Sequence, residues 1–219
     1  MRALILLITM FWCSYTALAS DSRIKVVVID TGISDEWRSK ANLCPEEHKD
    51  FTGTGLNDTH GHGTNVVGLI VENAPVRNYC IVVVKAYDRD KQYVTAALFY
   101  ALTIKADVIN LSGGGIGPQF AEQWIVSKLL ERKVLMIVAA GNNGTDLDKD
   151  CNFYPACYDK RITVVGAEAK YSNHGKVVDV VLSGKDQTAF GKTFHGTSQA
   201  TAIFTGRFLK GVAQKQQRR

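Results

Sequence analysis

The sequence contains no Cys-x-x-Cys pair, a spacing that structural zinc sites commonly use. It also lacks a dense run of lysine and arginine with interleaved aromatic residues. The net charge of the 219 residues is +5, and part of that excess lies in the tail 215–219. A nucleic-acid-binding domain usually presents a denser basic face. The composition therefore predicts no nucleic-acid partner. A zinc site is the alternative to disulfides for the cysteines, but we expect no metal and no cofactor.

The sequence has no apolar run long enough for a comfortable membrane span. Residues 3–12 are apolar, but Arg2 precedes them and Ala17-Leu18-Ala19 follows, which is the pattern of a signal peptide with a small-x-small cleavage site. We expect residues 1–19 to be a signal peptide, and the alternative is an uncleaved N-terminal anchor. The protein would then be secreted or periplasmic, with no stable membrane anchor.

Residues 20–219 show no repeat, no low-complexity linker and no break in composition, so we expect one domain. Continuous apolar strands alternating with helices imply an α/β fold, in which a mostly parallel sheet has helices on both faces. Apolar, β-branched runs predict strands at 24–29, 80–84, 108–111, 134–138, 162–165 and 177–182. Apolar positions at helical spacing predict helices at 63–72, 94–105, 119–132 and 199–212.

Removal of the signal peptide would take Cys13 with it and leave four cysteines. An even number of cysteines in an exported protein suggests disulfides. Four cysteines allow three pairings, and the sequence does not choose among them. We expect Cys151–Cys157 to close a small loop and Cys44–Cys80 to join a loop to a strand.

Three segments carry candidate catalytic residues, and the first of them ends a predicted strand. Asp30 lies in Val-Val-Ile-Asp-Thr-Gly. Asp-Thr-Gly also occurs in aspartic peptidases, and an aspartate after the first strand is common in doubly wound phosphatases. An aspartic peptidase needs two close carboxylates that share a proton. The chain has one Asp-Thr-Gly and no all-β pattern, so that interpretation fails. We interpret Asp35, Asp50 and Asp58 as turn and surface residues.

The other two segments each lie just ahead of a predicted helix. His62 stands in Gly-His-Gly-Thr, where small neighbours allow the close approach that a general base needs. Ser198 stands in Gly-Thr-Ser-Gln-Ala, where backbone N–H groups and the helix dipole would favour a nucleophile. Taken singly, a histidine here is more often structural or exposed, and we expect His60 to be such a residue in a loop. A serine here is more often an N-cap.

The order of these three residues along the chain is more specific than any one of them. In α/β-hydrolases the serine precedes its acid and histidine, whereas no histidine follows Ser198 here. The order Asp30, His62, Ser198 on an α/β pattern resembles the subtilisin family over nearly the whole chain after the signal peptide. The resemblance implies a serine endopeptidase with a polypeptide substrate. His62 would be the general base, oriented by Asp30, and Ser198 would form an acyl-enzyme. The alternative is a catalytically inactive relative that binds peptides in the same groove.

Further segments resemble the same family. The strand end Asp-Val-Ile-Asn-Leu-Ser-Gly-Gly implies that Ser112, Gly113 and Gly114 pair with an extended substrate. The segment Val-Ala-Ala-Gly-Asn-Asn-Gly implies that the side-chain amide of Asn142 belongs to the oxyanion hole. Tyr154-Pro155 resembles the border of the primary specificity pocket, where the resemblance implies a cis peptide bond.

The chain also departs from that family. No propeptide is evident between the signal peptide and the first strand, so we expect unaided folding, or a separate protein inhibitor or folding factor. The segment 62–76 lacks the family's calcium-binding insertion, which predicts no calcium requirement from that site. Asn65 replaces a usual histidine, Gln199 a usual methionine and Ala202 a usual proline. We expect the last two replacements to affect packing and helix geometry more than the catalytic residues.

Overall fold

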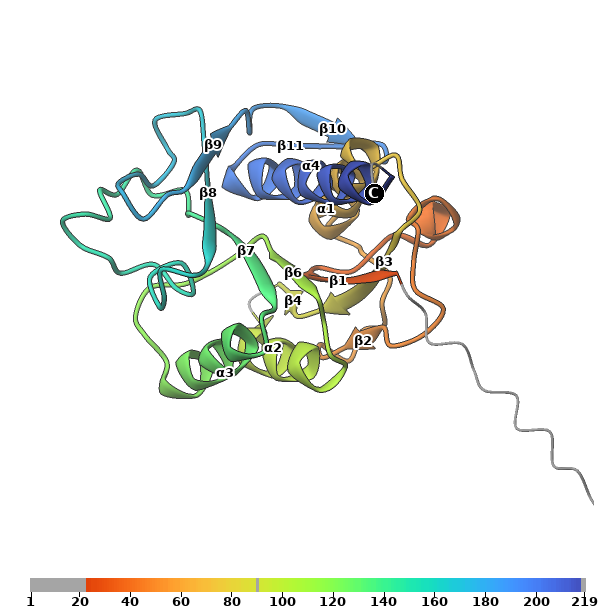
Figure 1. Ribbon diagram of the computed structural model, residues 1–219, viewed down its shortest axis with the longest axis horizontal. Helices are drawn as coiled ribbons and strands as arrows, with labels where there is room; N and C mark the ends of the chain where they lie inside the picture. Colours follow the sequence, from red (N-terminus) through yellow and green to blue (C-terminus); the bar gives the residue numbers. More distant parts are fainter. Residues whose placement is uncertain (1–22, 90, 218–219) are drawn as a thin grey trace, which may run out of the picture.

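The computed structural model describes residues 23–89 and 91–217, and the expected signal peptide lies outside them. Within this part of the chain, a seven-stranded sheet has the order β2-β3-β1-β6-β7-β8-β9, and every neighbouring pair is parallel (Figure 1). This confirms the expected α/β fold. The strands are β1 (Ile24–Asp30), β2 (Lys49–Asp50), β3 (Tyr79–Lys85), β6 (Val108–Leu111), β7 (Leu135–Ala139), β8 (Thr163–Ala167) and β9 (Val180–Leu182).

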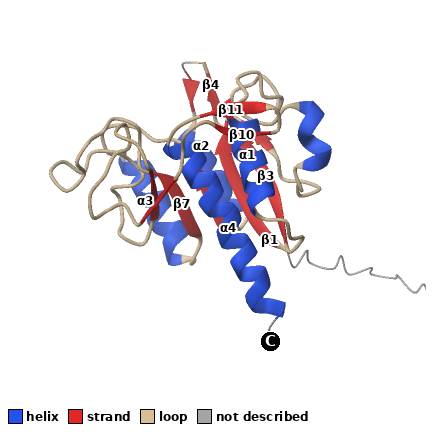
Figure 2. Cartoon of the chain, turned by 90° about the horizontal axis from the view of Figure 1, so that it is seen from above, coloured by secondary structure: helices blue, strands red, loops and turns tan. Residues whose placement is uncertain are grey.

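Among the described residues, two long helices cover each face of the sheet (Figures 1 and 2). On one face lie α1 (His62–Asn73) and α4 (Thr197–Gln217), and on the other lie α2 (Val94–Thr103) and α3 (Phe120–Glu131). The strand order explains this division. The α1 connection leads from β1 to β3, whereas the α2 connection leads back across β1 to β6. Right-handed crossovers in opposite directions put their helices on opposite faces.

The side chains of β1 show why its sequence is continuously apolar. Val27 and Ile29 pack in the core beneath α2 and α3, while Val26 and Val28 pack in the core beneath α1 and α4. All four are fully buried. Each such side chain contributes about 1.5–3 kcal/mol through removal of apolar surface from water. The sheet is therefore held from both faces, which fixes the position of the strand that ends at Asp30.

Several short elements were not predicted. They are η1 (Asp35–Lys40), β2 (Lys49–Asp50), β4 (Tyr87–Asp88), β5 (Lys91–Gln92), β10 (Gln187–Ala189) and β11 (Lys192–Phe194). Strands of two or three residues have too few positions to show an alternating pattern. The β10–β11 hairpin packs against α1, on the same side of the sheet as the start of α4.

Three predicted boundaries differ from the structure in ways that matter. Helix α1 begins at His62 and α4 at Thr197, so His62 and Ser198 lie inside the first turns rather than just ahead of them. The last predicted strand is shorter than expected, because the N–H of Val178 bonds to the carbonyl of Gly175 in a turn and β9 begins only at Val180.

Both expected disulfides are present. Cys44 bonds to Cys80 of β3 with an S–S distance of 2.09 Å, and Cys151 bonds to Cys157 with a distance of 2.06 Å. The second bridge closes a loop between β7 and β8. The Tyr154–Pro155 peptide bond in the same loop is cis, as the sequence resemblance implied.

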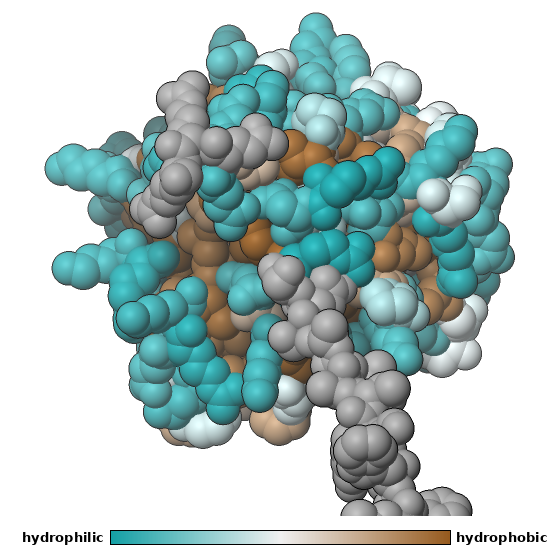
Figure 3. Space-filling model, turned by 45° about the vertical axis from the view of Figure 1, so that its right-hand side comes forward, coloured by the Kyte–Doolittle hydropathy of each residue, from teal (hydrophilic) through white to brown (hydrophobic). Residues whose placement is uncertain are grey.

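The surface is mainly hydrophilic on the face drawn in Figure 3, with hydrophobic residues visible between polar ones. A few large apolar side chains are exposed, among them Phe99, Phe120 and Trp124 on α2 and α3. In the part of the chain that the structure describes, no helix combines the length and apolar character needed to cross a bilayer.

Candidate active site

Three polar residues stand where neighbouring strands end. Asp30 is the last residue of β1, Ser112 directly follows β6, and Asn142 comes three residues after the end of β7. Strand β6 lies between β1 and β7, and parallel strands end at the same edge of a sheet. The connection after β1 leads to β3 on one side, and the connection after β6 leads to β7 on the other, so the two leave in opposite directions. Open α/β sheets hold their ligands at such a place.

Asp30 is joined to His62 by a short hydrogen bond. Its Oδ1 atom lies 2.7 Å from Nδ1 of His62 and also accepts the backbone N–H of Thr31 at 2.8 Å. Asp30 is buried, whereas 20% of the His62 side chain is exposed. An ionised carboxylate can only accept, so Nδ1 carries the hydrogen and Nε2 of the neutral ring keeps its lone pair. That tautomer is the one a general base requires.

Asp58 caps the start of α1, the helix that carries His62. The N-cap residue Gly61 has no side chain with which to cap it. Instead the Asp58 carboxylate accepts the N–H groups of Gly61 at 2.8 Å and Thr64 at 2.9 Å, and the Thr64 hydroxyl at 2.7 Å. Asp58 is only 5% exposed, so the expectation that it is a surface residue is wrong. An aspartate shortly before a predicted helix is a capping signal that could have identified it.

The residue after Asp30 is bonded to the residue after His62. Oγ1 of Thr31 accepts the N–H of Gly63 at 2.8 Å. A Cβ atom on Gly63 would collide with the carbonyl oxygen of Gly32, so a side chain there would push the helix away from the strand end. The small residue in Gly-His-Gly-Thr therefore permits the Asp30–His62 contact, as the sequence suggested.

The pKa of His62 is raised above its ordinary value of 6.5. Burial of the ring lowers it, but the charge and hydrogen bond of Asp30 and the charge of Asp58 together outweigh that effect. Both carboxylates stabilise the protonated ring. The site thus favours the imidazolium that a general base forms when it accepts a proton.

His60 stays outside this arrangement. It is exposed, its ring centroid lies 6.2 Å from that of His62, and it stacks on Phe194 at 5.8 Å. This matches its interpretation as a loop residue. Within residues 23–89 and 91–217, no three His, Cys, Asp or Glu side chains lie together in a group that could hold a metal ion.

Ser198, in the first turn of α4, is bonded to Ser112. Its hydroxyl donates to the Ser112 carbonyl at 2.9 Å, and the Ser112 hydroxyl donates to the Ser198 carbonyl at 3.2 Å. In the described part of the chain, no hydrogen bond joins Ser198 to His62. Ser112 lines both the hollow that contains Asp30 and His62 and the hollow that contains Ser198. The structure therefore pairs Asp30 with His62 and places Ser198 in the adjoining hollow.

Asn142 lies in that same hollow with its amide orientation fixed. Its Oδ1 atom accepts the N–H of Thr197 at 2.9 Å and the Thr197 hydroxyl at 3.0 Å. A backbone N–H can only donate, so the amide oxygen must face Thr197, and Nδ2 remains to donate elsewhere. Ser198 is the second residue of α4, and its N–H has no acceptor within the helix. These two groups are the donors an oxyanion hole needs.

The segment after β6 has backbone groups available for a substrate. Within the described residues, the N–H and C=O groups of Gly113 and Gly114 make no hydrogen bond, whereas Gly115 exchanges two with Tyr154, at 2.9 and 2.8 Å. The Tyr87 hydroxyl lies where a side chain on Gly113 would project. A peptide could therefore lie along this segment as an added strand.

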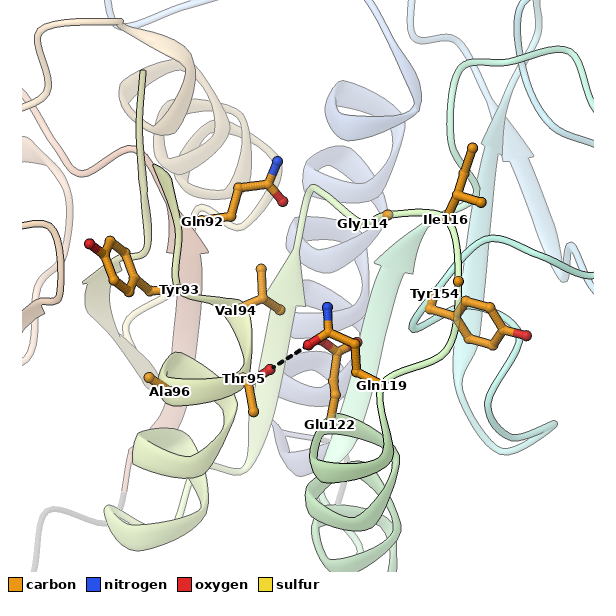
Figure 4. Close-up of a pocket in the computed structure, with 12 residues that line it drawn as sticks. Gln92, Tyr93, Val94, Thr95, Ala96, Gly114, Ile116, Gln119, Glu122 and Tyr154 are labelled. Atoms are coloured by element: carbon orange, nitrogen blue, oxygen red, sulfur yellow. Dashed lines mark hydrogen bonds between the residues drawn. The ribbon is translucent and has the colours of Figure 1, made fainter. Parts of the chain in front are cut away.

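A further pocket adjoins Gly114 between the starts of α2 and α3 (Figure 4). Thr95 and Gln119 approach each other across it, with 3.4 Å between Oγ1 and Oε1. Burial raises the pKa of Glu122, whose side chain lies beside Gln119. Gly114 lines this pocket and also the hollow that contains Ser198.

Two of the residues that depart from the family pattern are bonded to each other. Nε2 of Gln199 donates to Oδ1 of Asn65 at 3.1 Å, and both residues are fully buried. Nδ2 of Asn65 donates to the carbonyls of Gln187 and Lys192 at 3.0 and 2.8 Å. These contacts connect α1, α4 and the β10–β11 hairpin beside Ser198. Gln199 thus contributes a specific hydrogen bond between α4 and α1.

The fold and the site together define a class of protein. It comprises α/β proteins that gather an aspartate, a histidine and a serine, in that chain order, at the carboxyl edge of a parallel sheet. Comparison with known proteins then gives the family. The sequence model described as the subtilase family matches residues 21–215, and the chain belongs to that family.

Individual relatives agree with this assignment. The chain is 32% identical to an intracellular serine protease of Paenibacillus polymyxa over 212 residues, covering 84% of this chain and 64% of that protein. It is 28% identical to subtilisin amylosacchariticus of Bacillus subtilis subsp. amylosacchariticus, covering 84% of this chain and 54% of that protein. The chain thus spans between half and two thirds of the length of these two relatives.

A solved structure has the same fold. The crystal structure of a cold adapted subtilisin-like serine proteinase is similar with a TM-score of 0.71 and 25% sequence identity, and the match covers 91% of this chain and 79% of that one.

Proposed function

We propose that the protein is a serine endopeptidase in which Ser198 attacks the substrate carbonyl, His62 takes its proton and Asp30 orients His62. The observation that carries this proposal is the 2.7 Å Asp30–His62 hydrogen bond, which lies at the sheet edge that Ser198 and Asn142 share. Membership of the subtilase family supports it, as do relatives named as serine proteases.

The substrate would bind as an extended strand along Gly113 and Gly114. Its reacting carbonyl oxygen would then lie between Nδ2 of Asn142 and the backbone N–H of Ser198. Both donors are set before the reaction, because the Asn142 oxygen is held by Thr197 and the Ser198 N–H by the helix. Donors placed in advance stabilise the oxyanion without further rearrangement of the site.

The attack requires the Ser198 hydroxyl to change its acceptor. At rest it donates to the Ser112 carbonyl, and for reaction it must turn toward Nε2 of His62. As Oγ bonds to the carbonyl carbon, His62 receives the proton and the carbonyl oxygen becomes the oxyanion. The oxyanion then re-forms the carbonyl as the C–N bond breaks, His62 donates its proton to the leaving amine nitrogen, and the acyl-enzyme on Ser198 remains. A water molecule, deprotonated by His62, hydrolyses the acyl-enzyme and restores the serine.

The resting bond from Ser198 to Ser112 favours a second candidate function, a peptide-binding protein without catalysis. Digestion of a denatured protein by the purified chain separates the two. The endopeptidase predicts cleavage products that disappear in Ser198→Ala and in His62→Ala. Binding of peptides by the folded wild type, with no product above the Ser198→Ala background, would instead support the second function.

We further propose that the protein is exported by residues 1–19. The pattern of that segment and the presence of two disulfides support export, since such bonds persist in oxidising compartments. Expression of the full chain with N-terminal sequencing of the product tests this. Export predicts a chain that begins at Ser20 outside the cytoplasm, and an intact Met1 terminus on protein retained in the cytoplasm would contradict it.

A further inference from the structure

Phe153 occupies the space next to the candidate nucleophile. The hollow that contains Ser198 and Asn142 is bounded by the segments that follow β6 and β7, and Phe153 lines it. Gly114 belongs to the first segment and Gly141 to the second. A Cβ atom on Gly114 would lie 2.7 Å from Cε1 of the Phe153 ring, and one on Gly141 would lie 2.9 Å from Cε2. The tip of the ring, Cζ, would lie 2.9 Å from both. The ring therefore fills the space between the two glycines, which we call the slot.

The backbone around Phe153 is firmly held. Its carbonyl accepts the N–H of Cys157 at 3.0 Å, and the Cys151–Cys157 disulfide encloses it. The next residue, Tyr154, is paired with Gly115 through two backbone hydrogen bonds. The ring also packs against the core beneath α2 and α3. To leave the slot, the ring would have to give up its packing against the core. The hydrogen bonds and the disulfide that hold its backbone oppose such a movement.

The ring also separates two hollows. On its far side lies a second one, whose lining residues besides Phe153 include Ile116, Asn143, Leu147 and Asn173. Phe153 and Asn143 line both hollows. Truncation of Phe153 would therefore join them and deepen the space next to Ser198.

A peptide that reacts at Ser198 in the proposed binding mode would place one side chain in this slot. Its backbone would lie along Gly113 and Gly114, and its reacting carbonyl would point at the donors of Asn142 and Ser198, which belong to the other side of the hollow. The residue that supplies this carbonyl thus lies between the two segments, and its side chain faces the ring of Phe153.

We propose that Phe153 restricts the residue before the cleaved bond to small side chains such as those of glycine, alanine and serine. This inference rests on the proposed endopeptidase function. The restriction is steric, because the Phe153 ring fills the slot that a larger substrate side chain would need. A benzyl group that gains such an apolar slot typically gains about 10–100-fold in kcat/KM, whereas an occupied slot gives no such gain.

The test uses two peptidyl diphenyl phosphonates that differ only in the side chain at the reacting residue, methyl or benzyl. The ratio of their rates of covalent labelling shows how well the slot accepts a benzyl side chain relative to a methyl side chain. The measurement does not require turnover. We expect the wild type to react faster with the methyl probe. Phe153→Ala should raise the benzyl-to-methyl ratio by at least about 10-fold, and Phe153→Leu should give an intermediate ratio.

Two controls make the outcome interpretable. Phe120→Ala removes the same ring at a site that is 86% exposed and should leave the ratio unchanged. A small alkyl fluorophosphonate, which has no side chain for the slot, reports whether Ser198 reacts in each variant. If that probe labels all variants but the wild type prefers benzyl, or Phe153→Ala leaves the ratio unchanged, the role of Phe153 is refuted while the proposed function stands. If the fluorophosphonate fails to label the folded wild type, the proposed function itself is refuted.

Discussion

The two halves of the candidate site are held in different ways. In the acid–base half, Asp30 contacts His62 directly, and the buried carboxylate of Asp58 adds a second negative charge nearby. In the nucleophile half, Ser198 and Asn142 are held by neutral hydrogen bonds to Ser112 and Thr197. The charges of the first half determine the pKa of His62. The hydrogen bonds of the second half determine where the donors of Asn142 and Ser198 point. Changes in the first half should therefore alter the pH dependence, and changes in the second should alter the rate alone.

Asp30→Asn should have the largest effect of the variants in the acid–base half. The amide would present a donor or a weaker acceptor to Nδ1, so His62 would lose the required tautomer and the charge that stabilises its protonated form. We expect kcat for a peptide substrate to fall by about 10⁴-fold with the fold retained. Asp35→Asn, at an exposed aspartate of η1, is the control. A loss of less than 10-fold in folded Asp30→Asn would contradict the role of Asp30.

Asn142→Ala should have the next largest effect and should leave the pH profile in place. It removes one oxyanion donor and no charge near His62. We expect kcat to fall by about 10²–10³-fold, the range known for the oxyanion amide of subtilisin itself. Asn78→Ala, at the start of β3 and away from the site, should retain activity. A displaced pH profile in Asn142→Ala would show that the two halves are not separate.

Asp58→Asn should shift the pH profile with a smaller loss of rate. The Asp58 charge raises the pKa of His62, and catalysis needs the neutral ring, which exists above that pKa. Removing the charge lowers the pKa, so the acidic limb of kcat/KM should move to lower pH. The amide also replaces one of the two accepting oxygens of Asp58 by a donor, so a buried N–H group loses its acceptor, at a cost of about 1–3 kcal/mol of stability. Asp50→Asn changes a turn carboxylate bonded to Thr52 and Gly55 and should leave the limb unmoved. Equal profiles for both variants would refute the influence of Asp58.

The hydrogen bond between Asn65 and Gln199 should give the smallest effect, measurable as stability. Each single alanine variant leaves a buried amide without its partner, which typically costs about 1–3 kcal/mol in the free energy of unfolding. In a double-mutant cycle followed by urea unfolding, we expect a coupling of about 0.5–3 kcal/mol. A cycle between Gln199 and the distant Asn78 should give none. Zero coupling in the first cycle would mean that the bond does not link the helices.

The sequence predicted those site residues best whose position follows from a short local motif. Asp30 ends an apolar strand, and His62 and Ser198 lie in the first turns of helices, so each could be placed from local pattern and chain order. The parallel sheet followed from the same continuous apolar strands. That Asp30, His62 and Ser198 lie near one another was expected from the rule that parallel strands end at one edge of the sheet.

Residues whose role depends on distant contacts were not predicted. Asp58 was also missed, although its contacts with Gly61 and Thr64 are local and the capping signal was present in the sequence. Asn65 and Gln199 are 134 residues apart, and neither motif indicates the other. The position of Phe153 between Gly114 and Gly141 was not predicted, because it arises from three separate loops. Such contacts are set by tertiary packing, which the local pattern does not contain.

The most direct measurement is the rate at which a fluorophosphonate labels the purified, folded chain. A general-base-activated Ser198 predicts rapid labelling of the wild type, none in Ser198→Ala, and labelling slowed by at least about 100-fold in His62→Ala. If the folded wild type were labelled no faster than His62→Ala, the acid–base half would not activate the nucleophile, and the proposed endopeptidase would be wrong.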